Sequence, residues 1–146
     1  MGSRKRAIVL GAAVALLLSG STAAGTSALA APRIAQTWGT AIEVPGTAAL
    51  NQGGAAGITS MSCASAGNCS AGGHYFDSSF HSQAFVASQV NGTWHAAIEV
   101  PGIAALNTGG VAEVTSVSCA PAGTCSAGGD YYDSSGDTQL FVVSRT

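Results

Sequence analysis

The chain has 146 residues, of which 20 are Gly and only 8% are charged, and its formal net charge at pH 7 is −2. Three of its five basic residues lie within the first six positions, so the rest of the chain sets only Arg33 and Arg145 against seven acids. Two cations cannot neutralise a run of phosphates, so the composition disfavours nucleic acid and anionic membrane surfaces as partners.

The first thirty residues have the layout of a secretory signal peptide. The basic start "RKR" at residues 4–6 precedes an unbroken apolar run over residues 7–18, and the small-residue pattern Ala28-Leu29-Ala30 follows. Twelve apolar residues in that run are too few for a membrane-spanning helix. We therefore expect cleavage after Ala30, with residues 21–23 as a second possible site, and a secreted, extracellular product with no membrane attachment.

The remaining residues 31–146 form one two-repeat domain. Aligning residues 38–90 with residues 94–146 gives 34 identities in 53 positions without a gap, at a period of 56 residues. Such a period indicates a duplicated structural unit, and the frequent Gly, Pro, Asn and Ser residues exclude a helical repeat. We assign repeat 1 to about residues 38–93 and repeat 2 to about residues 94–146.

Each repeat predicts four short strands separated by turn residues. The expected strands in chain order are residues 38–44, 58–63, 69–76, 83–88, 94–100, 114–119, 125–132 and 139–144. The stretch "SQVNGTW" at residues 88–94 resembles the Asp-box turn of sialidase-type propellers. It differs in spacing and lacks the Asp, so it supports a hairpin at this position but not an enzyme.

Side-chain alternation indicates which faces of these strands are buried. Along residues 94–100, Trp94, Ala96, Ile98 and Val100 share one face, which predicts a half-buried strand. The runs Phe85-Val86-Ala87 and Phe141-Val142-Val143 are apolar at every position, so we expect both to be covered on both faces. Small residues at Ala71 and Gly73 predict the point where another sheet approaches closely.

Four-stranded units that end in a Trp strand are typical of β-propeller blades. The motifs "SCASAGNCSAGGHY", "FVAS" and "NGTWHAAIEVPG" resemble the units of secreted bacterial tandem-repeat proteins that carry Cys-containing, propeller-like repeats. The resemblance covers residues 38–146 and implies fold and secretion, but no activity. The predicted fold class is all-β, with two four-stranded antiparallel propeller-blade-like sheets.

Residues 38–44 match the fourth strand of a unit but precede the first complete unit. Repeat 2 needs such an outer strand, and an unpaired edge is an aggregation hazard. We expect residues 38–44 to pair antiparallel beside residues 139–144 and close the last sheet, within one chain or between neighbours. A propeller needs about four to eight blades, so the two sheets either pack together in a monomer or belong to a homo-oligomer that completes a ring.

The four cysteines repeat a C-x5-C spacing across the loop between the first two strands of each unit. Four cysteines allow three pairings, and duplication of the unit favours the local pairs Cys63–Cys69 and Cys119–Cys125. An exported protein is expected to form them. A zinc site needs four ligands, which two cysteines per unit do not supply, so we expect no metal and no cofactor.

The candidate ligand-binding residues are aromatic and acidic side chains that both repeats carry. A Trp or Tyr face can stack on a pyranose while a carboxylate accepts its hydroxyl groups, although packing explains the same aromatics without a ligand. An Asx-type turn likewise explains the acids. The set consists of Trp38, Trp94, Tyr75, Tyr131, Asp77 and Asp133.

Three functions remain in competition. The leading hypothesis is a secreted, non-enzymatic binding or surface module, with carbohydrate as its ligand class. The alternative is a structural or self-association repeat module. A propeller-type hydrolase comes third, because Arg33 and Arg145 alone cannot build a carboxylate-binding cluster and because none of the three histidines is repeated. No catalytic residue is therefore assigned.

Overall fold

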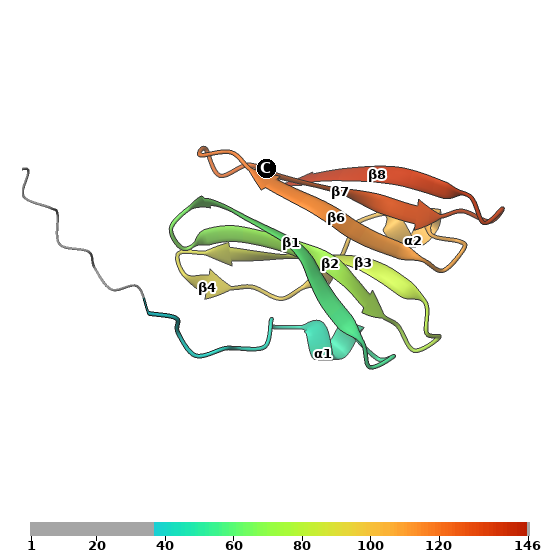
Figure 1. Ribbon diagram of the computed structural model, residues 1–146, viewed down its shortest axis with the longest axis horizontal. Helices are drawn as coiled ribbons and strands as arrows, with labels where there is room; N and C mark the ends of the chain where they lie inside the picture. Colours follow the sequence, from blue (N-terminus) through green and yellow to red (C-terminus); the bar gives the residue numbers. More distant parts are fainter. Residues whose placement is uncertain (1–36, 146) are drawn as a thin grey trace, which may run out of the picture. The chain divides into compact units, whose positions relative to one another are not determined.

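The computed structural model describes residues 37–145, so the predicted signal peptide at residues 1–30 lies outside the described residues. The chain divides into two units, Met1–Trp38 and Gly39–Thr146, and the second unit contains every described helix and strand. This unit is built from two antiparallel sheets and two single-turn helices (Figure 1). The all-β prediction is confirmed.

The N-terminal sheet is a meander with a divided outer strand. Strands β1 (Ala56–Ser65), β2 (Asn68–Phe76) and β3 (Ser82–Val90) lie in that order, and β4 (Thr93–Trp94) and β5 (Ile98–Glu99) both pair with β3. Asn91 and Gly92 join β3 to β4 with φ values of 50° and 83°, which is the geometry of a type I′ hairpin turn. The predicted hairpin at this position is confirmed.

The C-terminal sheet has three strands, β6 (Ala112–Cys119), β7 (Cys125–Tyr132) and β8 (Thr138–Arg145), in that order. The predicted four strands per sheet are therefore not confirmed for either sheet. Residues 39–44 lie in no strand, and within the described part of the chain β8 pairs only with β7. The predicted closure by this segment within one chain is therefore not seen. At the end of the segment, the backbone carbonyl of Pro45 accepts a 2.7 Å hydrogen bond from the amide of Ala97.

Two short helices were not expected. Helices α1 (Thr47–Leu50) and α2 (Ile103–Leu106) each follow a Pro-Gly pair, and their N-cap glycines Gly46 and Gly102 have φ values of 82° and 85°. Glycine adopts the left-handed backbone conformation at little cost, so each Pro-Gly pair can lead the chain into a single helical turn. Among residues 37–145, no helix is long and apolar enough to cross a membrane.

The predicted strand at residues 94–100 is interrupted, and its expected alternation is wrong. The chain leaves the edge of β3 after His95, whose amide donates to the carbonyl of Ser88 at 2.9 Å, and pairs with β3 again at Ile98. Ala97 and Val100 are consequently buried, whereas Ile98 is exposed. Alternation along a strand holds only while the backbone remains extended, and this segment is not extended throughout.

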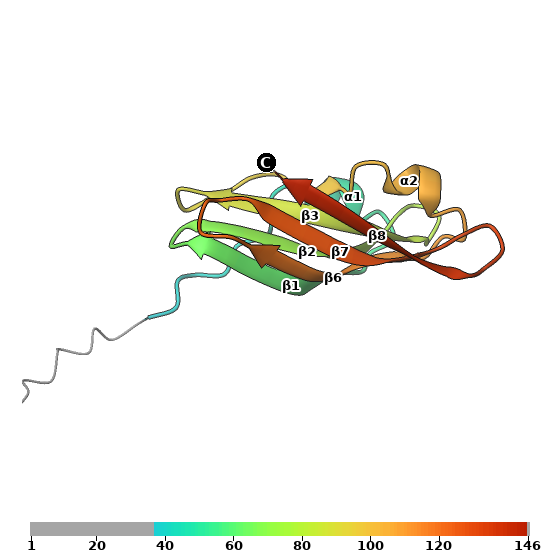
Figure 2. The ribbon, with the colours of Figure 1, turned by 90° about the horizontal axis from the view of Figure 1, so that it is seen from above.

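The two sheets pack face to face, with β6 against β1, β2 and β3 (Figure 2). Val114 and Val117 of β6 lie over Gly72, where an added Cβ atom would be only 2.6 Å from Cγ1 of Val114 and 3.2 Å from Cγ2 of Val117. The close approach predicted at Ala71 and Gly73 therefore occurs one residue away, on the other face of β2. Absence of a side chain at Gly72 lets β6 lie directly on the N-terminal sheet.

Hydroxyl side chains of β1 bind the backbone of β6 across this interface. The amides of Val117 and Cys119 donate to Oγ of Ser60 and Ser62, at 2.9 and 3.1 Å. The hydroxyl of Thr59 donates to the carbonyl of Val114. These bonds fix the register of one sheet on the other, in addition to the non-directional apolar packing.

We predict that Gly72→Ala destabilises the fold by about 1–3 kcal/mol, because the new methyl group overpacks the contact with Val114. The matched control is Gly128→Ala at the equivalent position of repeat 2, where the nearest atom to an added Cβ is 3.6 Å away. In dilute solution the free energy of unfolding of the control should lie within about 0.5 kcal/mol of the wild-type value or slightly above it. Urea unfolding of both variants measures the difference, and equal unfolding midpoints would contradict the packing described here.

Candidate functional site

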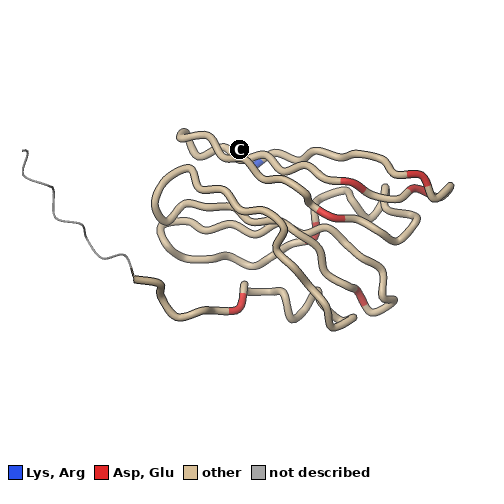
Figure 3. The backbone as a smooth tube through the Cα atoms, in the orientation of Figure 1, with Lys and Arg blue, Asp and Glu red and all other residues tan. Residues whose placement is uncertain are grey.

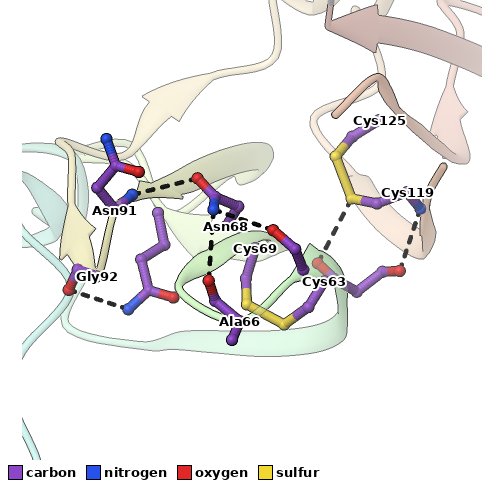
Figure 4. Close-up of a disulfide and its surroundings, with 11 residues drawn as sticks. Cys63, Ala66, Asn68, Cys69, Asn91, Gly92, Cys119 and Cys125 are labelled. Atoms are coloured by element: carbon purple, nitrogen blue, oxygen red, sulfur yellow. Dashed lines mark hydrogen bonds between the residues drawn. A yellow bond between two sulfur atoms is a disulfide. The ribbon is translucent and has the colours of Figure 1, made fainter. Parts of the chain in front are cut away.

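Both predicted disulfides form, and both are local. Cys63 bonds to Cys69 and Cys119 to Cys125, with Cα–Cα distances of 3.9 and 4.1 Å. In each pair the two cysteines lie directly opposite each other on neighbouring antiparallel strands. Figure 4 shows the second disulfide next to the loop that the first one closes. Two disulfides fit an extracellular protein.

The aromatic candidates of the N-terminal sheet are packing residues. Tyr75 is buried, and its hydroxyl donates a 2.7 Å hydrogen bond to Oε2 of Glu99. Burial and the neighbouring carboxylate raise the pKa of the Tyr75 phenol well above its usual range. Trp94 is half-buried and packs on the same apolar cluster, which also contains Phe85. The structure thus brings Tyr75 and Trp94 together, as part of a core rather than as an open platform.

The other two aromatic candidates lie elsewhere. Tyr131 is half-buried and packs against the apolar core between the two sheets. Trp38 is the last residue of the N-terminal unit and lies in no strand. The predicted aromatic residues therefore do not form one shared surface within Gly39–Thr146.

Asp77 holds the turn between β2 and β3. Its Oδ1 atom accepts hydrogen bonds from the amides of Ser79 and His81, at 2.8 and 3.0 Å, and its Oδ2 atom accepts one from the side chain of Gln83 at 3.0 Å. Partial burial opposes ionisation of this carboxyl, but the bonds from Gln83, His81 and Ser79 outweigh it and lower the pKa of Asp77. Both carboxylate oxygens are already used within the chain.

Asp133 does the same in repeat 2. Its carboxylate accepts hydrogen bonds from the side-chain amide of Gln139 at 2.9 Å and from the backbone amides of Ser135 and Asp137 at 2.8 and 3.1 Å. The hydrogen bond from Gln139, followed by those from the backbone, lowers the pKa of Asp133. Both acids predicted to bind a ligand are thus the organising residues of Asx-type turns.

An apolar groove of about 300 Å³ lies where the two sheets diverge. Ala71, Val86 and Ile98 line it from the N-terminal sheet, and Ala127 and Val143 line it from the C-terminal sheet. Its walls come from strands of both repeats, so no local sequence motif predicts it.

The outer faces of the two sheets carry exposed apolar side chains. On β8, Leu140 and Val142 are 82% and 87% exposed. On β1, Ile58 and Met61 are 52% and 59% exposed. The expectation that the run around Val142 is covered on both faces is therefore wrong, because none of residues 37–145 packs on the outer face of β8.

Charge is sparse and mostly acidic (Figure 3). Residues 37–145 contain seven acids and one basic residue, Arg145, if histidine is counted as neutral. Within this described part, no group of three or more His, Cys, Asp or Glu side chains is arranged to hold a metal ion.

We predict that Tyr75→Phe lowers the free energy of unfolding by about 1–2 kcal/mol, because a buried hydrogen bond to a carboxylate is lost. Tyr131→Phe is the matched control, since Tyr131 donates no side-chain hydrogen bond among the described residues, and it should change stability little. Folding raises the pKa of Tyr75, so wild-type stability should fall as the pH rises above about 10. Chemical unfolding at pH 8 to 11 tests both points, and an unchanged pH dependence in Tyr75→Phe would refute the second.

We predict a loss of stability at acid pH from Asp77 and Asp133. Because folding lowers both pKa values, their contribution is complete above about pH 4 and is lost as the pH falls below that value. The double variant Asp77→Asn/Asp133→Asn should be less stable at neutral pH and should lose less on acidification. Asp137→Asn is the control, because its carboxylate accepts no hydrogen bond among the described residues. Unfolding midpoints between pH 7 and pH 2.5 would decide, and parallel curves for wild type and the double variant would count against the assignment.

A comparison of the chain with models of known protein families gives no match, and a comparison with curated proteins gives none either.

Proposed function

We propose that this protein is a secreted, non-enzymatic self-association module whose copies bind one another through the apolar outer faces of their two sheets. The observation that carries the proposal is the exposure of Leu140 and Val142 on β8, at 82% and 87%. Both lie on a strand whose outer edge has no partner among the described residues. An apolar surface on a sheet edge is a typical site of strand addition or sheet packing.

The energy available from these faces is substantial. Full burial of a Leu, Val, Ile or Met side chain stabilises by about 1.5–3 kcal/mol. Leu140 and Val142 on one face and Ile58 and Met61 on the other are therefore enough to drive association once a complementary surface is present. Exposed apolar patches of this kind mark interaction sites.

The same contacts favour the self-association alternative over carbohydrate binding. Hydroxyl recognition needs free polar atoms, but Tyr75 is bonded to Glu99 and Asp77 is bonded to its own turn. Half of the residues that line the groove between the sheets are Ala, Val or Ile, and four serines, His95 and Arg145 are among the others, so its wall offers mainly apolar contact with a few polar groups.

We predict that wild-type protein associates reversibly and that Leu140→Ser/Val142→Ser weakens this association at least about tenfold, which corresponds to 1.4 kcal/mol. Phe80→Gly is the control, because Phe80 is also exposed but lies in the turn after β2, where its repeat counterpart is Gly136. Sedimentation velocity from micromolar to millimolar concentration measures the effect. A wild-type chain that stays monomeric throughout would refute the proposal, and binding to a glycan array that Trp94→Ala abolishes would support carbohydrate instead.

A further inference from the structure

The interface between the two sheets is made of two different faces of equivalent sheets. The N-terminal sheet contributes the face that bears Gly72, Ala84 and Val86, which we call the receiving face. The C-terminal sheet contributes the opposite type of face, bearing Val114 and Val117, which we call the covering face. An interface between unlike faces leaves one face of each type unused by a second sheet. On the N-terminal sheet, the chain's own residues Val44, Leu50, Trp94 and Ala97 cover Tyr75, Phe85 and Ala87 on that face, and Ile58 and Met61 remain exposed.

Those unused faces carry the repeat counterparts of the residues that are packed inside. The outer face of the C-terminal sheet is a receiving face, with Gly128, Leu140 and Val142 at the positions of Gly72, Ala84 and Val86. The outer face of the N-terminal sheet is a covering face, with Ile58 and Met61 in place of Val114 and Val117. An added Cβ at Gly128 would meet nothing closer than 3.6 Å. The space that the valines of β6 fill above Gly72 is therefore empty above Gly128 in the single chain.

The polar side chains that join the two sheets are also present in both copies. Within the chain, Ser60 and Ser62 accept amides of β6, and the side-chain amide of Asn107 donates to Oε1 of Gln83 at 2.9 Å. The counterparts are the same residue types, and all except Asn51 are exposed: Ser116, Ser118, Asn51 and Gln139. Oδ1 of Asn51, like Oδ1 of its docked counterpart Asn107, is buried without a hydrogen-bond partner among the described residues.

Where the two copies differ, the differences compensate. The larger Leu140 stands in place of Ala84, while the smaller Thr47 stands in place of Ile103, and Ala84 and Ile103 belong to the same core cluster. Within the chain, Nδ1 of His74 lies 3.6 Å from Oε1 of Glu113. Their counterparts are Asp130 and Gly57, so the outer faces would not place one carboxylate against another.

Residues 39–44, at the start of repeat 1, fit the free edge of β8 by the same correspondence between the repeats. In the N-terminal sheet, β5 pairs with β3 so that Ile98 lies opposite Val86 and Glu99 opposite Phe85. The counterparts in residues 39–44 are Ile42 and Glu43, which lie in no strand and are exposed. They would lie opposite Val142 and Phe141, and Glu43 would meet the hydroxyl of Tyr131 as Glu99 meets that of Tyr75.

We propose that the partner of each outer face is a second copy of this chain, bound head to tail. The N-terminal sheet of one copy packs on the C-terminal sheet of the next as the two sheets pack within one chain, and residues 39–44 add to the edge of β8. This rests on the proposed function and specifies which faces meet and in which register. Such a heterologous interface closes into a ring if the rotation allows and otherwise forms a filament. A ring of about four to eight sheets would need two to four copies.

The test uses two variants that each block one face of the full-length secreted chain. Val142→Asp blocks the receiving face and Met61→Asp blocks the covering face, and both positions are exposed in the single chain. Each variant alone should be monomeric by sedimentation velocity, whereas an equimolar mixture should give a 1:1 dimer through its two intact faces. Ser134→Asp adds the same charge in the turn after β7 and should associate like wild type.

The outcomes separate this inference from the proposed function. If wild type associates but the mixture of blocked variants stays monomeric, the head-to-tail register is wrong while the interaction function stands. If wild type does not associate, the proposed function itself fails. Gly128→Ala provides a second variant that leaves the fold intact. It should weaken association because the new methyl group would fill the space into which Ile58 and Met61 of the next copy pack.

The added strand is tested by cross-linking. Ile42→Cys protein mixed with Val142→Cys protein should form a disulfide-linked heterodimer, because the counterpart residues Ile98 and Val86 lie directly opposite each other. Thr40→Cys, two residues away on the same segment, should cross-link to Val142→Cys much less. Equal yields from the two positions would overturn the proposed register.

Discussion

The packing of Val114 and Val117 on Gly72 is the contact on which the rest of the structure depends. Because Gly72 has no side chain, the backbone of β6 comes close enough for its amides to reach the hydroxyl groups of Ser60 and Ser62. The apolar contact supplies most of the stabilising free energy, and the hydrogen bonds select one register. A bulkier residue at position 72 would separate the sheets and remove both effects.

Much of the fold is predictable because its determinants are local. The Asn91-Gly92 hairpin and the two disulfide pairings both follow from residues close together in sequence. The interruption between Trp94 and Ile98 does not, because it depends on which residues can reach the edge of β3. The sequence also does not predict which face of β2 packs on the second sheet. Ala71, Gly72 and Gly73 are all small, and only contact with β6 distinguishes Gly72 from its neighbours.

The candidate site was less predictable, for a related reason. Tyr75, Asp77 and Asp133 resemble ligand-binding residues in the sequence, but each is already bonded within the chain. Val86 and Val142 occupy equivalent positions of the repeat, yet one contributes to a core and the other is exposed. No pattern within a repeat can reveal this difference, because it depends on whether another sheet lies against that face.

The short span of each disulfide affects how the protein reaches its native state. Both bonds join cysteines six positions apart in sequence, and closing so small a loop costs little chain entropy. Oxidation therefore requires only that one hairpin has formed and does not require docked sheets. The two bonds can form independently and in either order, and a mispaired isomer would have to join two separate hairpins across a loop of about fifty residues. Correct pairing is thus encoded in the spacing and needs no tertiary template.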